Sequence, residues 1–169
     1  MTSPTPDSEK ISLRPELASD EPFLLRLYAS TREEEMALLG GNEAQAQAFA
    51  QMQFNFQKMS YEAQFPAADR SIVLAGEQEI GRIIVDRTGS EHHFIDIALL
   101  PEFRGRGIGG ALLGQLQQDA ARDGKGMRLS VRRDNPARRL YERMGFSITS
   151  EDSVYLFMNW SAPDAAEPG

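Results

Sequence analysis

The chain has 169 residues, of which 41% are hydrophobic and 25% are charged, a length and balance that suit one globular domain. It contains no cysteine, which excludes disulfides, a cysteine nucleophile and thiolate metal sites. The net charge of −7 argues against general binding of nucleic acids. No segment approaches the roughly 20 apolar residues that span a bilayer, and the polar N-terminus is unlike a signal peptide. We therefore expect a cytoplasmic protein that does not contact membranes.

Basic residues are concentrated between Arg104 and Arg143, where ten Lys and Arg stand against four Asp and Glu. In a chain that is acidic as a whole, such a segment is typical of a site for a small, strongly anionic ligand. The alternative is a solvated helix surface that is rich in arginine. Charge alone does not separate these two interpretations.

Hydrophobic spacing and turn residues predict one mixed α/β domain over residues 10–160, with flexible tails at residues 1–9 and 161–169. Strands are predicted over residues 11–14, 71–75, 79–86, 94–100, 127–131, 146–149 and 154–160. Helices are predicted from Pro22 until Gly40-Gly41, and over residues 42–64, 107–123 and 135–144. The order of the elements is therefore β-α-α-β-β-β-α-β-α-β-β.

The segment that joins the apolar strand 94–100 to the helix 107–123 is rich in glycine. It reads Arg104-Gly105-Arg106-Gly107-Ile108-Gly109-Gly110, four glycines and two arginines in seven residues. Glycine lets the backbone adopt positive φ and lets a ligand approach closely. Free N–H groups at the start of a helix bind anions, so this loop predicts a pyrophosphate site. The alternative is a tight turn that needs glycine for packing only.

Three of these glycines, Gly105, Gly107 and Gly110, also fit the G-x-G-x-x-G pattern of dinucleotide-binding proteins. In that fold the first glycine closely follows the strand, whereas Pro101-Glu102-Phe103-Arg104 intervene here. The fold also needs more parallel strands than the remaining chain supplies. A nucleotide-binding module of the NAD(P) type therefore remains a minor alternative.

The loop resembles the signature of the GNAT (GCN5-related) N-acetyltransferases, Arg/Gln-x-x-Gly-x-Gly/Ala after a buried strand. A second element of that family is an Asn about 30 residues further on, which opens a helix that carries a Tyr and ends in Gly-Phe. Here these residues are Asn135, Tyr141 and Gly145-Phe146. Both elements occur in order and at the family's spacing, so the chain is similar to this family over about residues 94–147.

The resemblance implies a single α/β (α+β) domain, with a central mixed, mostly antiparallel sheet of about seven strands and about four flanking helices. It implies acetyl-CoA as the cosubstrate and no metal. In the family the strand before the loop parts from the next parallel strand, and the pantetheine arm lies in the opening. The resemblance assigns parts of the cofactor to residues that match the family's motif: Leu99 and Leu100 to pantetheine, Arg104, Gly105, Arg106, Gly107, Ile108 and Gly109 to pyrophosphate, Asn135 to the pantetheine arm, and Arg138 or Arg139 to the 3′-phosphate.

Tyr141 resembles the family's general acid, which protonates the departing thiolate; the alternative is a Tyr packed on the inner face of its helix. A base must take a proton from the attacking amine, and Asp96, an ionisable residue inside an apolar strand, is the first candidate. Its alternative role is a buried hydrogen bond to a loop or an arginine. His93 and Asp86 are further candidates, and water without a dedicated base remains open. His92 and His93 are adjacent in a strand and point to opposite faces, so they are poor partners for one metal ion.

We expect an N-acetyltransferase in which a small-molecule or peptide amine attacks the thioester directly, within a ternary complex. The sequence does not identify the amine. A polar and aromatic series on the helix 42–64 either forms a pocket wall or packs into the core: Gln53, Phe54, Gln57, Tyr61 and Phe65. An inactive acyl-CoA-binding protein of the same fold is the main alternative. A homodimer is common in the family, and the apolar strand 154–160 is a candidate for its interface.

Overall fold

The computed structural model describes residues 10–33 and 42–163. The predicted helix end at Gly40-Gly41, the N-terminal tail and most of the C-terminal tail lie outside the described residues. The described elements, in chain order, are β1 (Ile11–Pro15), the 3₁₀ turn η2 (Ala18–Asp20), α1 (Glu21–Thr31), α3 (Glu43–Gln64), β2 (Asp69–Ala75), β3 (Gln78–Asp86), β4 (His92–Leu99), η3 (Pro101–Phe103), α4 (Ile108–Arg122), β5 (Met127–Arg132), α5 (Arg138–Arg143), β6 (Ser147–Glu151) and β7 (Tyr155–Trp160).

The strands form one seven-stranded sheet in the order β1-β2-β3-β4-β5-β7-β6. β4 and β5 are parallel, whereas β1 with β2, β5 with β7, and β6 with β7 are antiparallel. Together with the four α-helices of the described chain, this confirms the predicted fold class. Over residues 10–33 and 42–163 the elements follow the predicted order, with two short 3₁₀ turns in addition.

The chain divides into two compact units. The N-terminal unit contains the residues up to Ile84 and Asp96–Arg106, and the C-terminal unit contains Val85–Ile95 and the residues from Gly107 onward. Strands β3 and β4 therefore each contribute residues to both units.

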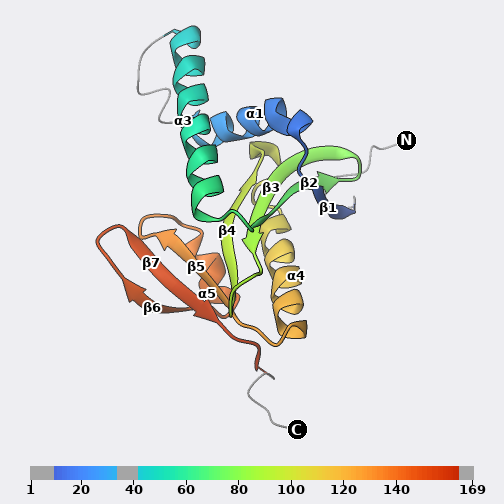
Figure 1. Cartoon of the computed structure of the whole chain (residues 1–169), viewed down its shortest axis with the longest axis vertical. Coiled ribbons are helices and arrows are strands. Elements are labelled where there is room, and N and C mark those ends of the chain that lie inside the picture. The colour runs from blue at the N-terminus through green and yellow to red at the C-terminus, as the bar shows by residue number, and fades with distance from the viewer. Residues whose placement is uncertain (1–9, 34–41, 164–169) are drawn as a thin grey trace. The chain divides into compact units, whose positions relative to one another are not determined.

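The core of the N-terminal unit lies where α1 and α3 pack together (Figure 1). α1 buries four residues at helical spacing, Phe23, Leu24, Leu27 and Tyr28, which is the pattern expected for an amphipathic helix. Tyr28 meets Phe54 of α3 edge to face, with ring centroids 6.0 Å apart. α3 begins at the cap residue Asn42, whose side chain accepts a hydrogen bond from the backbone N–H of Gln45 at 2.8 Å.

The core of the C-terminal unit is built on α4 and the alternating strand β5. α4 buries Ile108, Leu112, Leu113, Leu116 and Ala120 along one stripe. β5 buries every second residue, Met127, Leu129 and Val131, as a strand with one solvated face should. Figure 1 shows β5, β7 and β6 side by side in the same unit.

The helix predicted over residues 135–144 is shorter in the structure, since α5 begins only at Arg138. The side chain of Asn135 accepts a hydrogen bond from the backbone N–H of Ala137 at 2.9 Å, and the backbone N–H groups of Arg138 and Arg139 bond three residues back. These contacts build a turn, so Asn135 precedes the helix and is not its N-cap. That role belongs to Ala137, whose side chain can accept no hydrogen bond.

Candidate functional site

The Gly-rich loop adopts the backbone conformation that its glycines predict. φ is +72° at Gly105 and +80° at Gly107, in the left-handed region that L-residues rarely occupy. A Cβ atom added at either position would meet no protein atom within 4 Å. Both glycines are therefore required by the backbone and leave open space beside it, which argues against the alternative that they serve internal packing.

Gly107 is also the N-cap of α4, and no side chain caps this helix end. The first helical hydrogen bond runs from the N–H of Ala111 to the carbonyl of Gly107, at 3.0 Å. The N–H groups of Ile108, Gly109 and Gly110 precede that bond and point out of the helix N-terminus. The helix dipole adds positive potential there, so this end of α4 suits a phosphate group.

The two arginines of the loop are exposed, and both contact protein groups. Arg104 donates from Nε to the carbonyl of Leu99 at 2.9 Å and from Nη2 to the hydroxyl of Ser30 at 3.3 Å. The guanidinium of Arg106 lies 5.9 Å from the ring centroid of Phe103. The Leu99 carbonyl keeps one lone pair for a second hydrogen bond, because Arg104 occupies only one of the two.

Tyr141 lies on α5, is 8% exposed and sits in an aromatic cluster. Its ring meets Phe94 and Phe146 edge to face, with centroids 6.1 Å apart in both pairs. The parallel register of β4 and β5 contains only His92 with Met127 and His93 with Arg128, so it ends at the residue before Phe94. Tyr141 therefore packs at the place where this pairing stops, with a small part of its surface accessible.

Arg138, predicted to meet the 3′-phosphate, is partly exposed and pairs with Glu142 one turn later on α5, at 3.1 Å. Such surface pairs contribute little to stability and exchange readily. The side chain is therefore available to an anionic ligand at small energetic cost.

Asp96 lies on β4 and accepts a hydrogen bond from Nη2 of Arg82 on β3 at 2.5 Å. Nη2 also reaches the amide oxygen of Gln57 on α3, at 3.4 Å. Burial in an otherwise apolar strand is thus explained by an arginine partner, one of the two roles that the sequence leaves open. Whether Asp96 also serves as the base stays a prediction.

The two other candidates for the base have lowered pKa values. Burial lowers the pKa of His93 to about 4, helped by the charge of Arg128 and opposed by Asp86. His93 is therefore neutral at pH 7 and a weak proton acceptor. Hydrogen bonds from the hydroxyl and backbone N–H of Thr88 hold the pKa of Asp86 below its usual range. Neither group is tuned toward neutral pH, where a general base works best.

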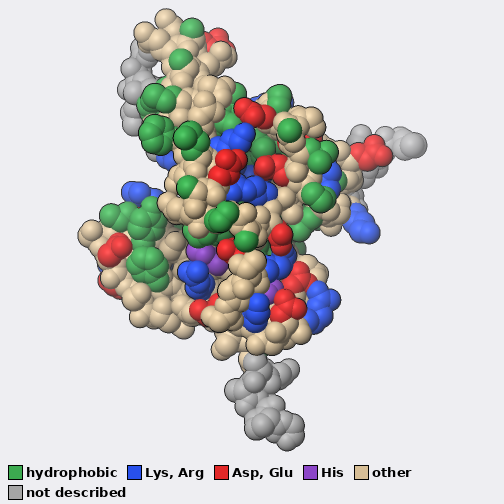
Figure 2. Space-filling model, in the orientation of Figure 1, with side chains coloured by type: hydrophobic (Ala, Val, Ile, Leu, Met, Phe, Trp, Pro, Cys, Tyr) green, Lys and Arg blue, Asp and Glu red, His purple; other side chains and the backbone are tan. Residues whose placement is uncertain are grey.

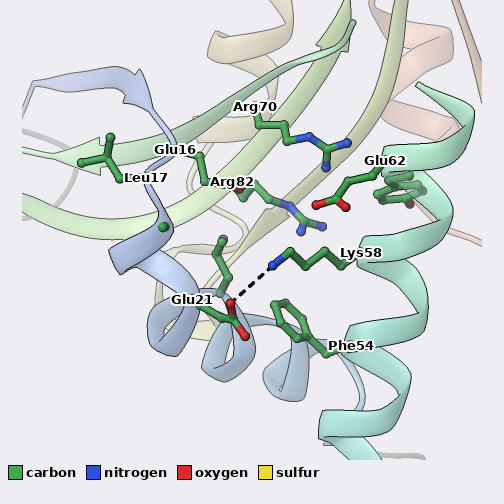
Figure 3. Close-up of a pocket in the computed structure, with 11 residues that line it drawn as sticks. Glu16, Leu17, Glu21, Phe54, Lys58, Glu62, Arg70 and Arg82 are labelled. Atoms are coloured by element: carbon green, nitrogen blue, oxygen red, sulfur yellow. Dashed lines mark hydrogen bonds and ion pairs between the residues drawn. The ribbon is translucent and has the colours of Figure 1, made fainter. Parts of the chain in front are cut away.

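A pocket of about 250 Å³ lies within the N-terminal unit and was not predicted. Residues from the link that follows β1 and from η2, α1, α3, β2 and β3 line it: Glu16, Leu17, Ala18, Glu21, Leu24, Phe54, Lys58, Tyr61, Glu62, Arg70 and Arg82. Figure 3 shows the charged ends of Lys58, Glu62, Arg70 and Arg82 pointing into the same space. Phe54 and Tyr61 belong to the polar and aromatic series on the helix 42–64 for which a pocket wall was one of two predicted roles. Arg82, like Asp96, is a charged residue inside an apolar strand, and this pattern could have identified it in the sequence as a candidate site residue.

Among the described residues, no cluster of three or more His, Asp or Glu side chains could hold a metal ion. No helix in the described part of the chain is long and apolar enough to cross a membrane.

Residues 68–148 match the family profile of the acetyltransferase (GNAT) domain. A search of curated proteins gives no significant match. Many solved proteins have a similar structure. A first example is the PaiA N-acetyltransferase of Thermoplasma acidophilum, crystallised with coenzyme A (TM-score 0.69, 18% identity, 90% of this chain and 99% of that one). The second is an acetyltransferase from Thermus thermophilus (TM-score 0.62, 18% identity, 88% and 95%). The third is nourseothricin acetyltransferase (TM-score 0.51, 26% identity, 58% and 67%).

Residues 68–148, just under half of the chain, therefore carry the sequence pattern of a GNAT acetyltransferase domain. The profile match includes the Gly-rich loop and the Tyr141 helix, and the sheet with its four helices is the fold of the similar solved structures.

Proposed function

We propose that the protein transfers an acetyl group from acetyl-CoA to the nitrogen of a primary amine, by direct attack in a ternary complex. The observation that carries this proposal is the loop Arg104–Gly109. Two positive-φ glycines with open space beside them lead into an uncapped helix N-terminus, which fits a pyrophosphate. The N–H groups of Ile108 and Gly109 would hold it, with Arg104 and Arg106 close in sequence to add charge.

Acetyl-CoA supplies an activated acetyl thioester. The nitrogen of a neutral amine forms a bond to the acetyl carbon, the carbon–sulfur bond breaks, and the sulfur takes a proton. We assign the donation of that proton to the hydroxyl of Tyr141. Tyr141 lies on the short helix α5, and its ring is held by contacts with the rings of Phe94 and Phe146. The amine gives its own proton to a base, for which Asp96 remains the first candidate, or to water. No covalent enzyme intermediate is required, which agrees with a chain that has no cysteine.

Thermal unfolding with acetyl-CoA, CoA, NAD and NADP in parallel tests the cofactor. A ligand at about 100 times its dissociation constant adds roughly 2.7 kcal/mol of stability. We expect acetyl-CoA and CoA alone to raise the melting temperature. A rise with NAD or NADP, and none with CoA, would refute the loop assignment.

Release of free thiol from acetyl-CoA in the presence of a panel of amines tests the reaction. We expect release that depends on both the enzyme and an amine, with the acetylated amine detected by mass. CoA binding without release over a broad panel would favour the alternative, an acyl-CoA-binding protein of the same fold that has lost catalysis.

A further inference from the structure

The pocket of the N-terminal unit combines apolar walls with charges that are only partly paired. Leu24 and Phe54 form buried parts of its lining. Figure 2 shows basic and acidic side chains gathered on the face of this unit where Figure 1 places β2, β3 and α3. The volume of about 250 Å³ is below the roughly 300–1,000 Å³ of pockets for drug-sized ligands, so the pocket suits a small molecule.

Two of its cations already have carboxylate partners. Lys58 pairs with Glu21 at 3.3 Å, at the exposed rim. Arg82 pairs with Asp96 through Nη2 at 2.5 Å. Arg82 is 9% exposed, and its Nε is buried without any hydrogen-bond acceptor. A buried donor that lacks an acceptor costs free energy, which a ligand oxygen at that position would recover.

Three further charged residues line the pocket without a direct hydrogen bond or ion pair to any described residue. Among the described residues, the side chains of Glu16, Glu62 and Arg70 make no hydrogen bond or ion pair. Glu16 is half-buried, and burial raises its pKa, against the opposing pull of Arg82 and Arg70. The pocket therefore offers two carboxylates and one guanidinium that make no direct hydrogen bond within the described chain, together with the buried Nε–H of Arg82.

We propose that this pocket binds the acceptor as an amino acid-like zwitterion, with its carboxylate at Arg82 and Arg70 and its ammonium at Glu16 and Glu62. A ligand of one charge would satisfy only half of these groups and would face repulsion from the other half. A zwitterion satisfies both, and the apolar wall at Leu24 and Phe54 receives its side chain. The statement that the ligand is the acetyl acceptor rests on the proposed function. The statement that the pocket binds a zwitterion does not depend on it.

Calorimetric titration of the full chain tests the proposal, with and without saturating CoA. The probes are the standard L-amino acids, and each one that binds is compared with its decarboxylated amine and its N-acetylated form. We expect at least one amino acid to bind, and both of its analogues to bind roughly tenfold or more weakly, since each loses a charged hydrogen bond. No binding of any amino acid at about 10 mM, or equal binding of the amine without the carboxylate, would overturn the proposal.

Variants locate the bound carboxylate. Arg70→Gln removes a guanidinium that makes no hydrogen bond or ion pair with the described residues, so the fold should stay intact. Amino acid binding should weaken roughly tenfold. Arg82→Lys keeps a cation for Asp96 and removes Nε, and should have a similar effect. Arg143→Gln, on an exposed arginine of α5 in the other unit, is the matched control and should bind as the wild type does. Equal loss in all three variants, or in none, would refute the assigned position.

The two proposals fail in different ways. If CoA does not bind but an amino acid does, the pocket assignment stands and the acetyltransferase proposal falls. If thiol release occurs and simple amines serve as well as amino acids, the enzyme stands and the zwitterion falls.

Discussion

The ion pair between Asp20 and Arg14 gives the sharpest prediction about stability. Both carboxylate oxygens of Asp20 accept from the guanidinium, at 2.7 and 2.8 Å, and one also accepts from the backbone N–H of Leu17 at 2.7 Å. The hydrogen bonds from Arg14 are the main cause that lowers the pKa of Asp20 from 3.8 to about 2. Asp20 is buried at the start of α1, so solvent screens these contacts little.

That shift converts into free energy. Each pKa unit corresponds to about 1.4 kcal/mol, so a fall from 3.8 to about 2 stabilises the ionised folded state by about 2 kcal/mol at pH 7. Because the folded state has the lower pKa, the stabilisation is present above pH 3.8 and is lost as the pH falls toward 2. By the same relation about half of it remains at pH 3.

Asp20→Asn removes the charge and keeps the shape. We expect urea unfolding at pH 7 to show a loss of about 2 kcal/mol, and the difference between variant and wild type to shrink by about half at pH 3. Asp134→Asn is the control, because Asp134 is 79% exposed and pairs with Arg132 at 3.4 Å. An exposed pair of this kind contributes about 0–1 kcal/mol. A loss below about 0.5 kcal/mol for Asp20→Asn, or a difference that does not change between the two pH values, would refute the argument.

Three further predictions concern the site. Tyr141→Phe should lower thiol release by roughly 10²–10⁴-fold while the thermal shift with CoA is retained, and unchanged release would exclude Tyr141 as the general acid. Gly105→Ala and Gly124→Ala should each lose about 1 kcal/mol, since both positions have positive φ and open space, but only Gly105→Ala should weaken CoA binding in calorimetry. NMR should show the ring of His93 titrating near pH 4. Because His93 of the unfolded chain has the higher pKa and is protonated first, His93 should lower the stability of the fold as the pH falls from 6.5 toward 4. A measured pKa near 6.5 in the folded protein would contradict this prediction.

The Gly-rich loop could be predicted because its cause is local. Positive φ at Gly105 and Gly107 is a property of the backbone, and the sequence shows glycine directly before a helical pattern. The start of α5 could not be predicted in the same way. Asn135 has the chemistry of an N-cap, but its side chain bonds within the turn that precedes the helix. An Asn favours both arrangements, and only the surrounding structure decides between them.

Asp96 shows a different limit of prediction. A charge inside an apolar strand indicated a special role, and the structure supplies a partner 14 residues earlier in the chain. Arg82 also lies inside an apolar strand, so an ion pair between Arg82 and Asp96 could have been predicted from the sequence. The pocket could not be predicted from the sequence. It is lined by Glu16, Lys58 and Arg70, which lie far apart in the chain and come together only when their segments pack.

Gly145 ends α5 with φ at +97°, and a Cβ atom there would lie 3.2 Å from the indole of Trp160. The same indole belongs to the last residue of β7, and it is the only tryptophan in the chain. Its fluorescence is therefore an intrinsic optical reporter of one place, the end of the helix that carries Tyr141. A change in emission on adding CoA, without any dye or label, would reveal movement of that helix in real time, and stopped-flow mixing could then separate cofactor binding from the reaction that follows.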